Sequence, residues 1–329
     1  MKSKAQNFQF ISWSELGYQQ FLSKRDGEIR LGERFVNAEQ ARFVVLGIEE
    51  SIGPKANLGN SGAENGFKAF CSRFLNMQST TTLLGDSVGF LGSVQTSGEA
   101  ISELYAVVNE LDDFVCEVLS RFVSSEQVLI VVGGGHNNAL PIIQSRFNTL
   151  NARLNVINLD AHADYRSLEG RHSGNPFSYA VDQGLIEKYF VLGLHQRYNN
   201  EDSLQRLQKD NQHFTFFEDY IDCKSCFEQD VRDVGAALLT THLPFGVELD
   251  MDSIENMPSS AVSPSGFSMT EARYYIRQMA RINQCYYLHL PEAAPKNEKE
   301  AGLVGKALSY LVTDFISCHP FSNLERLSE

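Results

Sequence analysis

Short apolar segments separated by longer amphipathic ones recur along most of the chain. Each apolar segment is about one β-strand long and is rich in β-branched and aromatic residues. Several are apolar almost throughout, which is typical of strands buried on both faces of a sheet. The predicted strands cover Phe43–Ile48, Val128–Val132, Leu154–Leu159, Tyr189–Leu194, His213–Phe217, Phe245–Leu249 and Cys285–Leu290.

The stretches between these strands have the spacing of helices. From Ile101 to Phe122, apolar residues recur every three or four positions and form one stripe along a helix. Strands alternating with helices are typical of βαβ units, so we expect an α/β fold with a mostly parallel sheet covered by helices on both faces. Further helices are predicted at about 64–76, 137–149, 224–239, 268–282 and 300–317.

The chain divides into a short polar N-terminal part and a long remainder. Residues 1–40 are mixed and polar, and we expect them to form an extension packed on the main domain. No Pro/Gly-rich linker or internal repeat divides residues 41–329, so we expect a single domain there. Segment 51–66 is rich in Gly and Asn and is expected to form a loop that reaches over a site.

The composition excludes several classes of protein. The 329 residues include 28 Lys+Arg and 41 Asp+Glu, a formal net charge of −13, and 43% of them are hydrophobic. The apolar fraction argues against a disordered chain, and the acidic balance argues against nucleic-acid binding. No run of about 18 apolar residues occurs, so no membrane span is expected. No apolar segment follows the N-terminal charges, so we expect no secretion signal and a cytoplasmic protein.

The cysteines agree with a reducing environment. Six cysteines are too few for a disulfide scaffold in a chain of this length. Cys223 and Cys226 form a CxxC without a second pair to complete a zinc site, so we expect two plain thiols. The histidines outside any motif are expected to be structural or surface residues: His195, His213, His242, His289 and His319.

Three predicted strands end in residue types that bind metals. Spacing by two on an extended chain directs side chains to the same side. Each motif alone is also compatible with a turn or a cap, but together they offer four carboxylates and two imidazoles. Two divalent ions need that many carboxylates and one does not, and this donor set suits Mn²⁺ better than structural zinc. The residues are His136 in VVGGGH, Asp160, His162 and Asp164 in LDAHAD, and Asp250 and Asp252 in LDMD.

These motifs, in this order, resemble those of the ureohydrolase superfamily, which contains arginase, agmatinase and formimidoylglutamase. The resemblance runs from about residue 43 to about residue 317 and implies the three-layer α/β/α arginase fold. It implies a homo-oligomer and two Mn²⁺ ions per chain, with a bridging hydroxide that attacks the amidine or guanidine carbon of a small-molecule substrate. By resemblance, one ion is held by His136, Asp160, Asp164 and Asp250, and the other by Asp160, His162, Asp250 and Asp252.

The resemblance also implies catalytic roles for three residues. Asp164 would accept a hydrogen bond from the hydroxide and help to move its proton to the leaving amine. His172, in RHSGNP, occupies the position of a proton-shuttling histidine. Glu292, in HLPEAAP, would pair with the cationic nitrogens of the substrate, because a planar cation accepts a bidentate carboxylate.

The chain departs from the family pattern around these motifs. Glu248 stands where a small residue is common before DxD, and Glu255 replaces the usual third Asp. Asn137 follows His136 where Asp, Ser or Glu is common, and the loop after Asp252 is shortened. These changes leave the six expected ligands intact, so they affect the expected identity of the substrate more than the expected metal binding.

Arginines near the DAHAD motif bear on the choice of substrate. Arg166 lies two residues after Asp164 and is expected to point into the same cleft, with Arg171 and Arg197 as weaker candidates for a second clamp. The run DAHADYRSLEGRHSGNPF resembles the formimidoylglutamase branch, whose substrate carries two carboxylates that an Arg fork can bind. The expected reaction is hydrolysis of N-formimidoyl-L-glutamate to L-glutamate and formamide, a step of histidine degradation.

Other activities remain open from the sequence. A urea-releasing arginase, agmatinase or guanidino-acid hydrolase would use the same metal ligands. A non-catalytic family member is disfavoured because all six ligand residues are present. A deacetylase with a single zinc would not need four aspartates.

Overall fold

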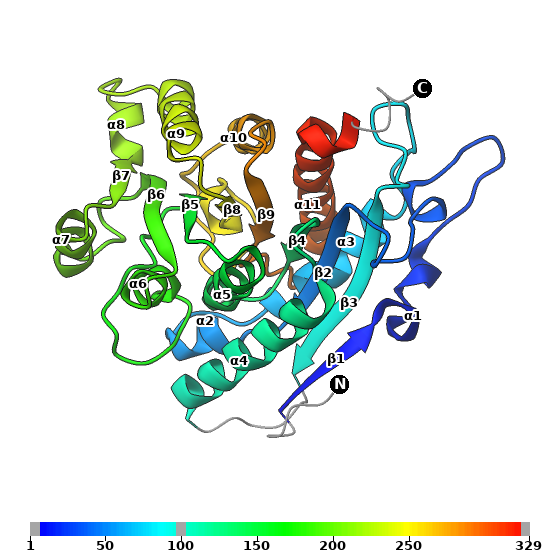
Figure 1. Cartoon of the computed structure of the whole chain (residues 1–329), viewed down its shortest axis with the longest axis horizontal. Coiled ribbons are helices and arrows are strands. Elements are labelled where there is room, and N and C mark those ends of the chain that lie inside the picture. Colours follow the sequence, from blue (N-terminus) through cyan, green and yellow to red (C-terminus); the bar gives the residue numbers. More distant parts are fainter. Residues whose placement is uncertain (1–6, 97–102, 324–329) are drawn as a thin grey trace.

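A single nine-stranded sheet forms the centre of the protein. The computed structural model describes residues 7–96 and 103–323. The strand order is β1-β3-β2-β4-β9-β8-β5-β6-β7 (Figure 1). All neighbouring strands run parallel except β1, which pairs antiparallel with β3 at one edge. The strands are β1 Phe8–Ser12, β2 Phe43–Glu49, β3 Val88–Thr96, β4 Val128–Val132, β5 Leu154–Leu159, β6 Ile186–Leu194, β7 His213–Phe216, β8 Phe245–Leu249 and β9 Cys285–Leu290.

Helices cover both faces of this sheet, and each face has its own apolar core. Residues of α3, α9, α10 and α11 pack on one face, and residues of α2, α4, α5, α6 and α7 pack on the other (Figure 1). The helices are α1 Trp13–Leu16, α2 Ile52–Ala56, α3 Gly66–Phe74, α4 Leu104–Phe122, α5 Ala139–Leu150, α6 Pro176–Asp182, α7 Glu201–Lys209, α8 Phe217–Ile221, α9 Phe227–Thr241, α10 Met269–Ala280 and α11 Glu298–Cys318. None of the helices in the described ranges has the length and apolar character to cross a membrane.

The central strands are apolar on both sides because each side faces a different core. In β2, Phe43 and Val45 belong to one core cluster, whereas Val44, Leu46 and Ile48 belong to the other. Successive side chains of a strand point to opposite faces, so a strand covered on both faces needs apolar residues at every position. This requirement explains the continuous apolar runs, and it confirms the expected α/β fold with a mostly parallel sheet.

The predicted strands and long helices are all present, and four strands have the predicted bounds: β4, β5, β8 and β9. The prediction missed β3, in which glycines and polar residues interrupt the apolar run. Gly92 in β3 has a φ of 144°, and the pairing with β2 shifts register beside it. The prediction also missed β1 and the short helices α1, α2, α6, α7 and α8. Four of these helices have only four to seven residues, too few to show a helical repeat, and α7 buries only Ser203 and Leu207.

The described part of the N-terminal segment lies along one edge of the sheet. Strand β1 pairs with β3 from Phe8↔Thr96 to Ser12↔Gly92. Beyond β1, Trp13 packs against Phe90 of β3, with ring centroids 4.3 Å apart. Antiparallel pairing lets this segment close the sheet edge without a crossover helix.

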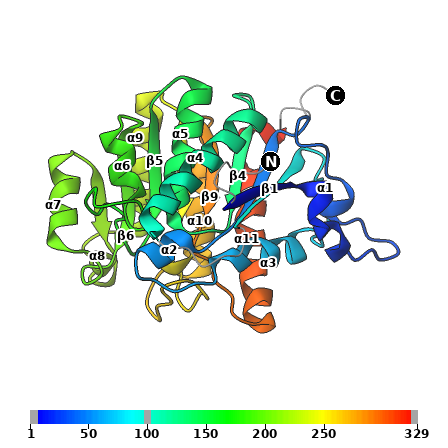
Figure 2. The same ribbon diagram turned by 90° about the horizontal axis from the view of Figure 1, so that it is seen from below.

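The parallel strands place the metal-binding motifs side by side. Strands β4, β9, β8 and β5 are consecutive neighbours, and the chain leaves each of them at the same edge of the sheet. His136, Glu292, Asp250 and Asp160 follow these four strands within a few residues. In Figure 2, α2, which follows β2, and the yellow segment that follows β8 lie along the lower side of the molecule. Asn60, after β2, donates a hydrogen bond through Nδ2 to Ser260 O, after β8.

We predict that Gly47→Ala destabilises the protein by about 1–3 kcal/mol, the usual cost of overpacking a core. A methyl group at Gly47, in β2, would overlap the ring of Phe67 from α3. Gly235→Ala in α9 is the matched control, because the nearest side-chain atoms to its added methyl, on Met279 and Ile282, are 3.5 Å away. The control is expected to stabilise the helix by up to about 1 kcal/mol. Urea unfolding of both variants measures the difference, and equal midpoints would contradict the prediction.

Candidate metal centre

A glycine turn places His136 at the end of β4. Gly133 and Gly134 have φ values of 89° and 73°, in the region that favours glycine. A Cβ at Gly133 would lie 2.7 Å from the carbonyl oxygen of Ile48, so the turn also needs glycine for space. The chain therefore reverses direction immediately after the buried strand and brings the His136 ring over the strand ends.

Three carboxylates converge on one nitrogen of the His136 ring. Its Nδ1 lies 3.3 Å from Asp160 Oδ2, 2.9 Å from Asp164 Oδ2 and 3.0 Å from Asp250 Oδ2. One ligand atom from each of these four residues lies within 4.8 Å of the others, close enough for a single cation to contact all four. This group matches one of the two ligand sets that the sequence implied, and its members come from the ends of β4, β5 and β8.

A second group of possible ligands adjoins the first through Asp160. His162 Nδ1 lies 3.2 Å from Asp252 Oδ2 and 3.7 Å from Asp160 Oδ1. Asp160, His162 and Asp252 again have ligand atoms within 4.8 Å of one another. The arrangement has the form of a binuclear centre, in which Asp160 belongs to both groups.

Hydrogen-bonded turns, rather than extended chain, make the acidic motifs converge. Asp160 Oδ1 accepts a hydrogen bond from His162 N at 2.7 Å, and Asp250 Oδ1 accepts one from Asp252 N at 2.8 Å. Residues Met251–Ser253 form a single 3₁₀ turn, and Asp164 has a φ of 47°. The expected extended geometry was therefore wrong, although its consequence, convergence of the side chains, is observed.

Burial and mutual repulsion make this group of carboxylates electrostatically unfavourable without a cation. Burial and the neighbouring carboxylates raise the pKa of Asp160 to about 6, against the effect of His136. Burial, Asp252 and Asp160 raise the pKa of Asp250 well above its usual value. Burial disfavours a charged His136, but the hydrogen bonds that its ring donates to Asp160, Asp164 and Asp250 raise its pKa well above the usual value.

Divalent cations fit this donor set. A cation bound between the carboxylates would offset their repulsion and replace the proton that His136 otherwise shares with them. Asp252 Oδ1 is also buried and has no hydrogen-bond partner within the described part of the chain. Buried carboxylate oxygens without donors are costly unless a cation or water compensates them.

The two groups open onto a cleft of about 490 Å³. His162, Asp164, Asp250 and Asp252 are among the residues that line it. Pro54, Asn57 and Gly59 also line it, so the 51–66 segment, which contains α2 as well as loop, borders the site.

Glu292 lies beside the carboxylates at the end of β9. Its backbone has a φ of 65°, held by hydrogen bonds from its own N to Gly134 O and from Ser260 N to its O. Its Oε1 accepts a hydrogen bond from His136 N at 2.8 Å, and Oε2 is buried without a partner among the described residues. Burial raises its pKa to about 8. Because Glu292 lines the cleft, the unpartnered oxygen is available to a hydrogen-bond donor there.

Two of the three candidate arginines line the cleft. Arg166 and Arg197 both border it, and the Arg166 side chain is 48% exposed. Arg166 Nη1 donates a hydrogen bond to Asn57 Oδ1 at 2.8 Å, which connects it to the overlying loop. The cleft is therefore lined by acidic side chains of the two groups and by two cationic side chains.

Comparison with known proteins identifies the family. The model of the arginase family matches residues 41–317. The chain belongs to the arginase family. The match, together with the paired metal-binding groups, makes it a metal-dependent hydrolase acting on linear amidines.

The relatives of this arginase-family chain include several formimidoylglutamases. That of Macrococcus caseolyticus is 24% identical over 306 residues, 89% of each chain. That of Streptococcus pyogenes is 32% identical over 172 residues, 49% of each chain.

Solved structures share the fold at lower identity. Bacillus subtilis formimidoylglutamase has a TM-score of 0.77 at 16% identity, covering 91% of this chain and 95% of its own. Trypanosoma cruzi formiminoglutamase with Mn²⁺ has a TM-score of 0.72 at 20% identity, covering 89% and 100%. Entamoeba histolytica arginase with L-ornithine has a TM-score of 0.68 at 18% identity, covering 84% and 99%. These similarities confirm the arginase-like fold.

Arg171, expected as a second clamp, does not border the cleft of this arginase-family protein. Its side chain is 1% exposed, and its Nε donates to Asp112 Oδ2 at 2.8 Å. Nη2 donates to Asn137 O at 2.8 Å, beside His136. The expectation of substrate contact was therefore wrong, because buried partners occupy this guanidinium. Its contact with Asn137 instead supports the main chain that carries His136.

His172, expected as a proton shuttle, is also held away from the cleft lining. Its Nδ1 accepts a hydrogen bond from Gly174 N at 3.0 Å, and its Nε2 lies 3.2 Å from Glu169 Oε1. The residue is 1% exposed. Both nitrogens are engaged in the turn that precedes α6, so the geometry does not support a shuttle.

Sequence reasoning missed Glu50, which follows β2. Its buried carboxylate accepts hydrogen bonds from Gly135 N at 2.9 Å and from Asn138 Nδ2 at 2.6 Å. These bonds fix the glycine turn before His136. The signal was present in FVVLGIEE, where two carboxylates follow an apolar run, as they do in the DAHAD and DMD motifs after β5 and β8.

We predict that Asp250→Asn lowers bound Mn²⁺ and hydrolase activity together. The amide removes a negative charge from the crowded group, and we expect activity to fall by more than the 10–100-fold that is typical of groups that only orient a ligand. Metal analysis of Mn²⁺-equilibrated, desalted protein provides the measurement. Asp233→Asn on the exposed face of α9 is the control and should retain both. Full activity at reduced metal content would contradict a requirement for both ions.

Proposed function

We propose that this chain hydrolyses N-formimidoyl-L-glutamate to L-glutamate and formamide, a step of histidine degradation, using two Mn²⁺ ions. The observation that carries the proposal is one cleft lined by both the acidic centre and two arginines, Arg166 and Arg197. The substrate has matching ends: a cationic formimidoyl group and two carboxylates. The named formimidoylglutamase relatives support the same choice.

The acidic centre suits the reacting end of this substrate. His136, Asp164 and Asp250 would hold one ion, His162 and Asp252 the other, with Asp160 in both groups. When bound, such ions supply Lewis acidity and lower the pKa of water, so that a nucleophile forms near neutral pH. Water adds to the formimidoyl carbon, and the bond from that carbon to the glutamate nitrogen breaks.

Two carboxylates in the cleft would orient the substrate and move its proton. Glu292 Oε2, which has no partner within the described ranges, would accept a hydrogen bond from a nitrogen of the formimidoyl group. Asp164, which borders the cleft, would take the proton from the attacking water and deliver it to the departing glutamate nitrogen. Both roles fall to residues that line the cleft, and His172, which lies outside the cleft lining, takes no part in them.

The arginines suit the other end of the substrate. A guanidinium binds a carboxylate through two parallel hydrogen bonds, and a dicarboxylate offers a partner to each arginine. Asn57 holds Arg166 on the wall of the cleft, which lowers the entropy lost when substrate binds. We propose the pair Arg166 and Arg197 as the clamp, in place of the set that included Arg171.

A urea-releasing hydrolase is the second candidate. Carboxylates that line the cleft bind a guanidinium as readily as an amidine, and the fold is shared with an arginase. Arginine carries one carboxylate beside a cationic amine, and agmatine carries none, so a cleft with two arginines favours the dicarboxylate.

We predict that the Mn²⁺-loaded protein releases formamide from formimidoylglutamate and turns over arginine, agmatine and guanidinobutyrate at far lower rates. Formamide and urea are measured on the same samples. Urea release from any of the last three, without formamide release, would preserve the metal chemistry and contradict the proposed substrate.

We predict that Arg166→Ala raises KM for formimidoylglutamate by about 10–100-fold. The estimate follows from the ~1.5–3 kcal/mol of a charge-assisted hydrogen bond, at about 1.4 kcal/mol per tenfold. Bound Mn²⁺ should stay unchanged, because Arg166 contacts none of the metal-binding groups. Arg153→Ala removes an arginine that pairs with Glu187 away from the cleft and is the control. An unchanged KM would remove Arg166 from the clamp.

A further inference from the structure

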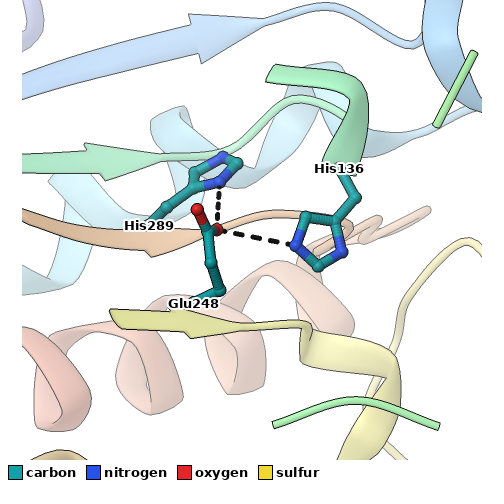
Figure 3. A group of neighbouring side chains, drawn as sticks. All are labelled: His136, Glu248 and His289. Atoms are coloured by element: carbon teal, nitrogen blue, oxygen red, sulfur yellow. Dashed lines mark hydrogen bonds and ion pairs between the residues drawn. The ribbon is translucent and has the colours of Figure 1, made fainter. Parts of the chain in front are cut away.

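Glu248 is a buried carboxylate behind the metal-binding groups. It lies in β8, two residues before Asp250, and pairs in register with His289 of β9. Both residues are 0% exposed. Figure 3 shows the Glu248 carboxylate between the rings of His289 and His136.

Two donors hold this carboxylate in place. His289 Nδ1 lies 2.6 Å from Glu248 Oε2, and Tyr287 Oη donates a hydrogen bond to Glu248 Oε1 at 2.9 Å. The bonds come from two residues of the same neighbouring strand. A buried carboxylate held by two donors is rigid, because moving it would leave both donors unpaired.

The other side of the carboxylate faces His136. His136 Nδ1 points to Asp160, Asp164 and Asp250, whereas Nε2 points away from them and lies 3.5 Å from Glu248 Oε2. Nε2 is buried and makes no hydrogen bond within the described part of the chain. An imidazole that offers the lone pair of Nδ1 to a cation carries its proton on Nε2. A buried N–H needs an acceptor, and the Glu248 carboxylate faces it.

We propose that Glu248 is a positioning residue for His136. Its carboxylate, held by His289 and Tyr287, receives the Nε2–H of His136 and thereby keeps Nδ1 directed at the metal-binding group. A carboxylate behind a histidine ligand also makes the ring a stronger donor to the metal. This inference rests on the proposed binuclear function and adds a specific support for one of its two ions.

The same three side chains could alternatively hold an ion of their own. Ligand atoms of His136, Glu248 and His289 lie within 4.8 Å of one another. The 2.6 Å spacing between His289 and Glu248 is that of a hydrogen bond, and Tyr287 engages the second oxygen. None of the three residues lines the cleft. These contacts favour a role for Glu248 in positioning His136 over a separate site for a third ion.

The proposal predicts an effect on one ion. His136 belongs to the group with Asp164 and Asp250 and is absent from the group with His162 and Asp252. Loss of the support for His136 should therefore weaken the binding of one Mn²⁺ ion and leave the binding of the other unchanged. A general loss of folding would instead weaken the binding of both ions together.

Glu248→Gln tests the proposal, because it removes the charge and keeps the volume. Mn²⁺ titration followed by electron paramagnetic resonance of the free ion gives the two dissociation constants without any substrate. We expect one of them to rise by about 10–100-fold, the range typical of such outer partners, and the other to stay within a few-fold. Asp314→Asn is the control: Asp314 is a buried carboxylate held by Arg273 and Arg277, and its loss should change neither constant.

Each other outcome overturns the proposal in a recognisable way. Unchanged constants in folded Glu248→Gln overturn it and leave the proposed function intact. A third Mn²⁺ in the wild-type chain, lost in this variant, overturns it in favour of the separate ion site. A wild-type chain that binds no pair of Mn²⁺ ions refutes the proposed function itself, and this inference with it.

A second variant covers the case in which Glu248→Gln fails to fold. Tyr287→Phe removes one hydrogen bond to the carboxylate and leaves the Glu248 side chain in place. It should raise the same dissociation constant by a few-fold. No change in that constant would overturn the proposal.

Discussion

Repulsion among buried carboxylates is the constraint on which the centre of this protein depends. Asp160, Asp164 and Asp250 all contact one nitrogen of His136, and Asp160 and Asp250 are almost completely buried. Groups that repel one another cannot hold themselves together, so the surrounding structure must place them. The parallel sheet does this through its strand order, which brings β4, β9, β8 and β5 next to one another. The apolar cores on both faces make those strand ends rigid.

Buried charged groups around the centre orient His136, which the strand order alone only brings close to the carboxylates. Glu50 fixes the glycine turn before His136, Arg171 holds the carbonyl oxygen of Asn137 after it, and Glu248 faces the far side of the ring. Each of these residues lies outside the set that borders the cleft. The protein therefore uses several buried charged groups to orient one histidine. This arrangement separates residues that position the centre from those that would meet the substrate.

A large part of the fold was predictable from the sequence, because strands buried on both faces leave continuous apolar runs. Four strands had the predicted bounds, whereas β3 was missed, since its glycines and polar residues interrupt the pattern. The candidate ligands were predictable for a related reason. Asp, His and Asp at the end of an apolar strand are costly to bury unless something pairs them. Local sequence alone carried both signals.

Only the tertiary structure decided which charged residues border the cleft. Arg166 and Arg171 are five positions apart and equally polar in sequence, yet one lines the cleft and the other is buried against Asp112. The same holds for two histidines. His172, expected as a proton shuttle, is held in a turn, whereas His289, expected to be an ordinary structural or surface residue, holds the carboxylate behind the centre. Spacing along the chain determined which side chains lie near a strand end. Contacts between segments far apart in sequence determined where each charged group finds its partner, because a buried charge adopts the position in which it is paired.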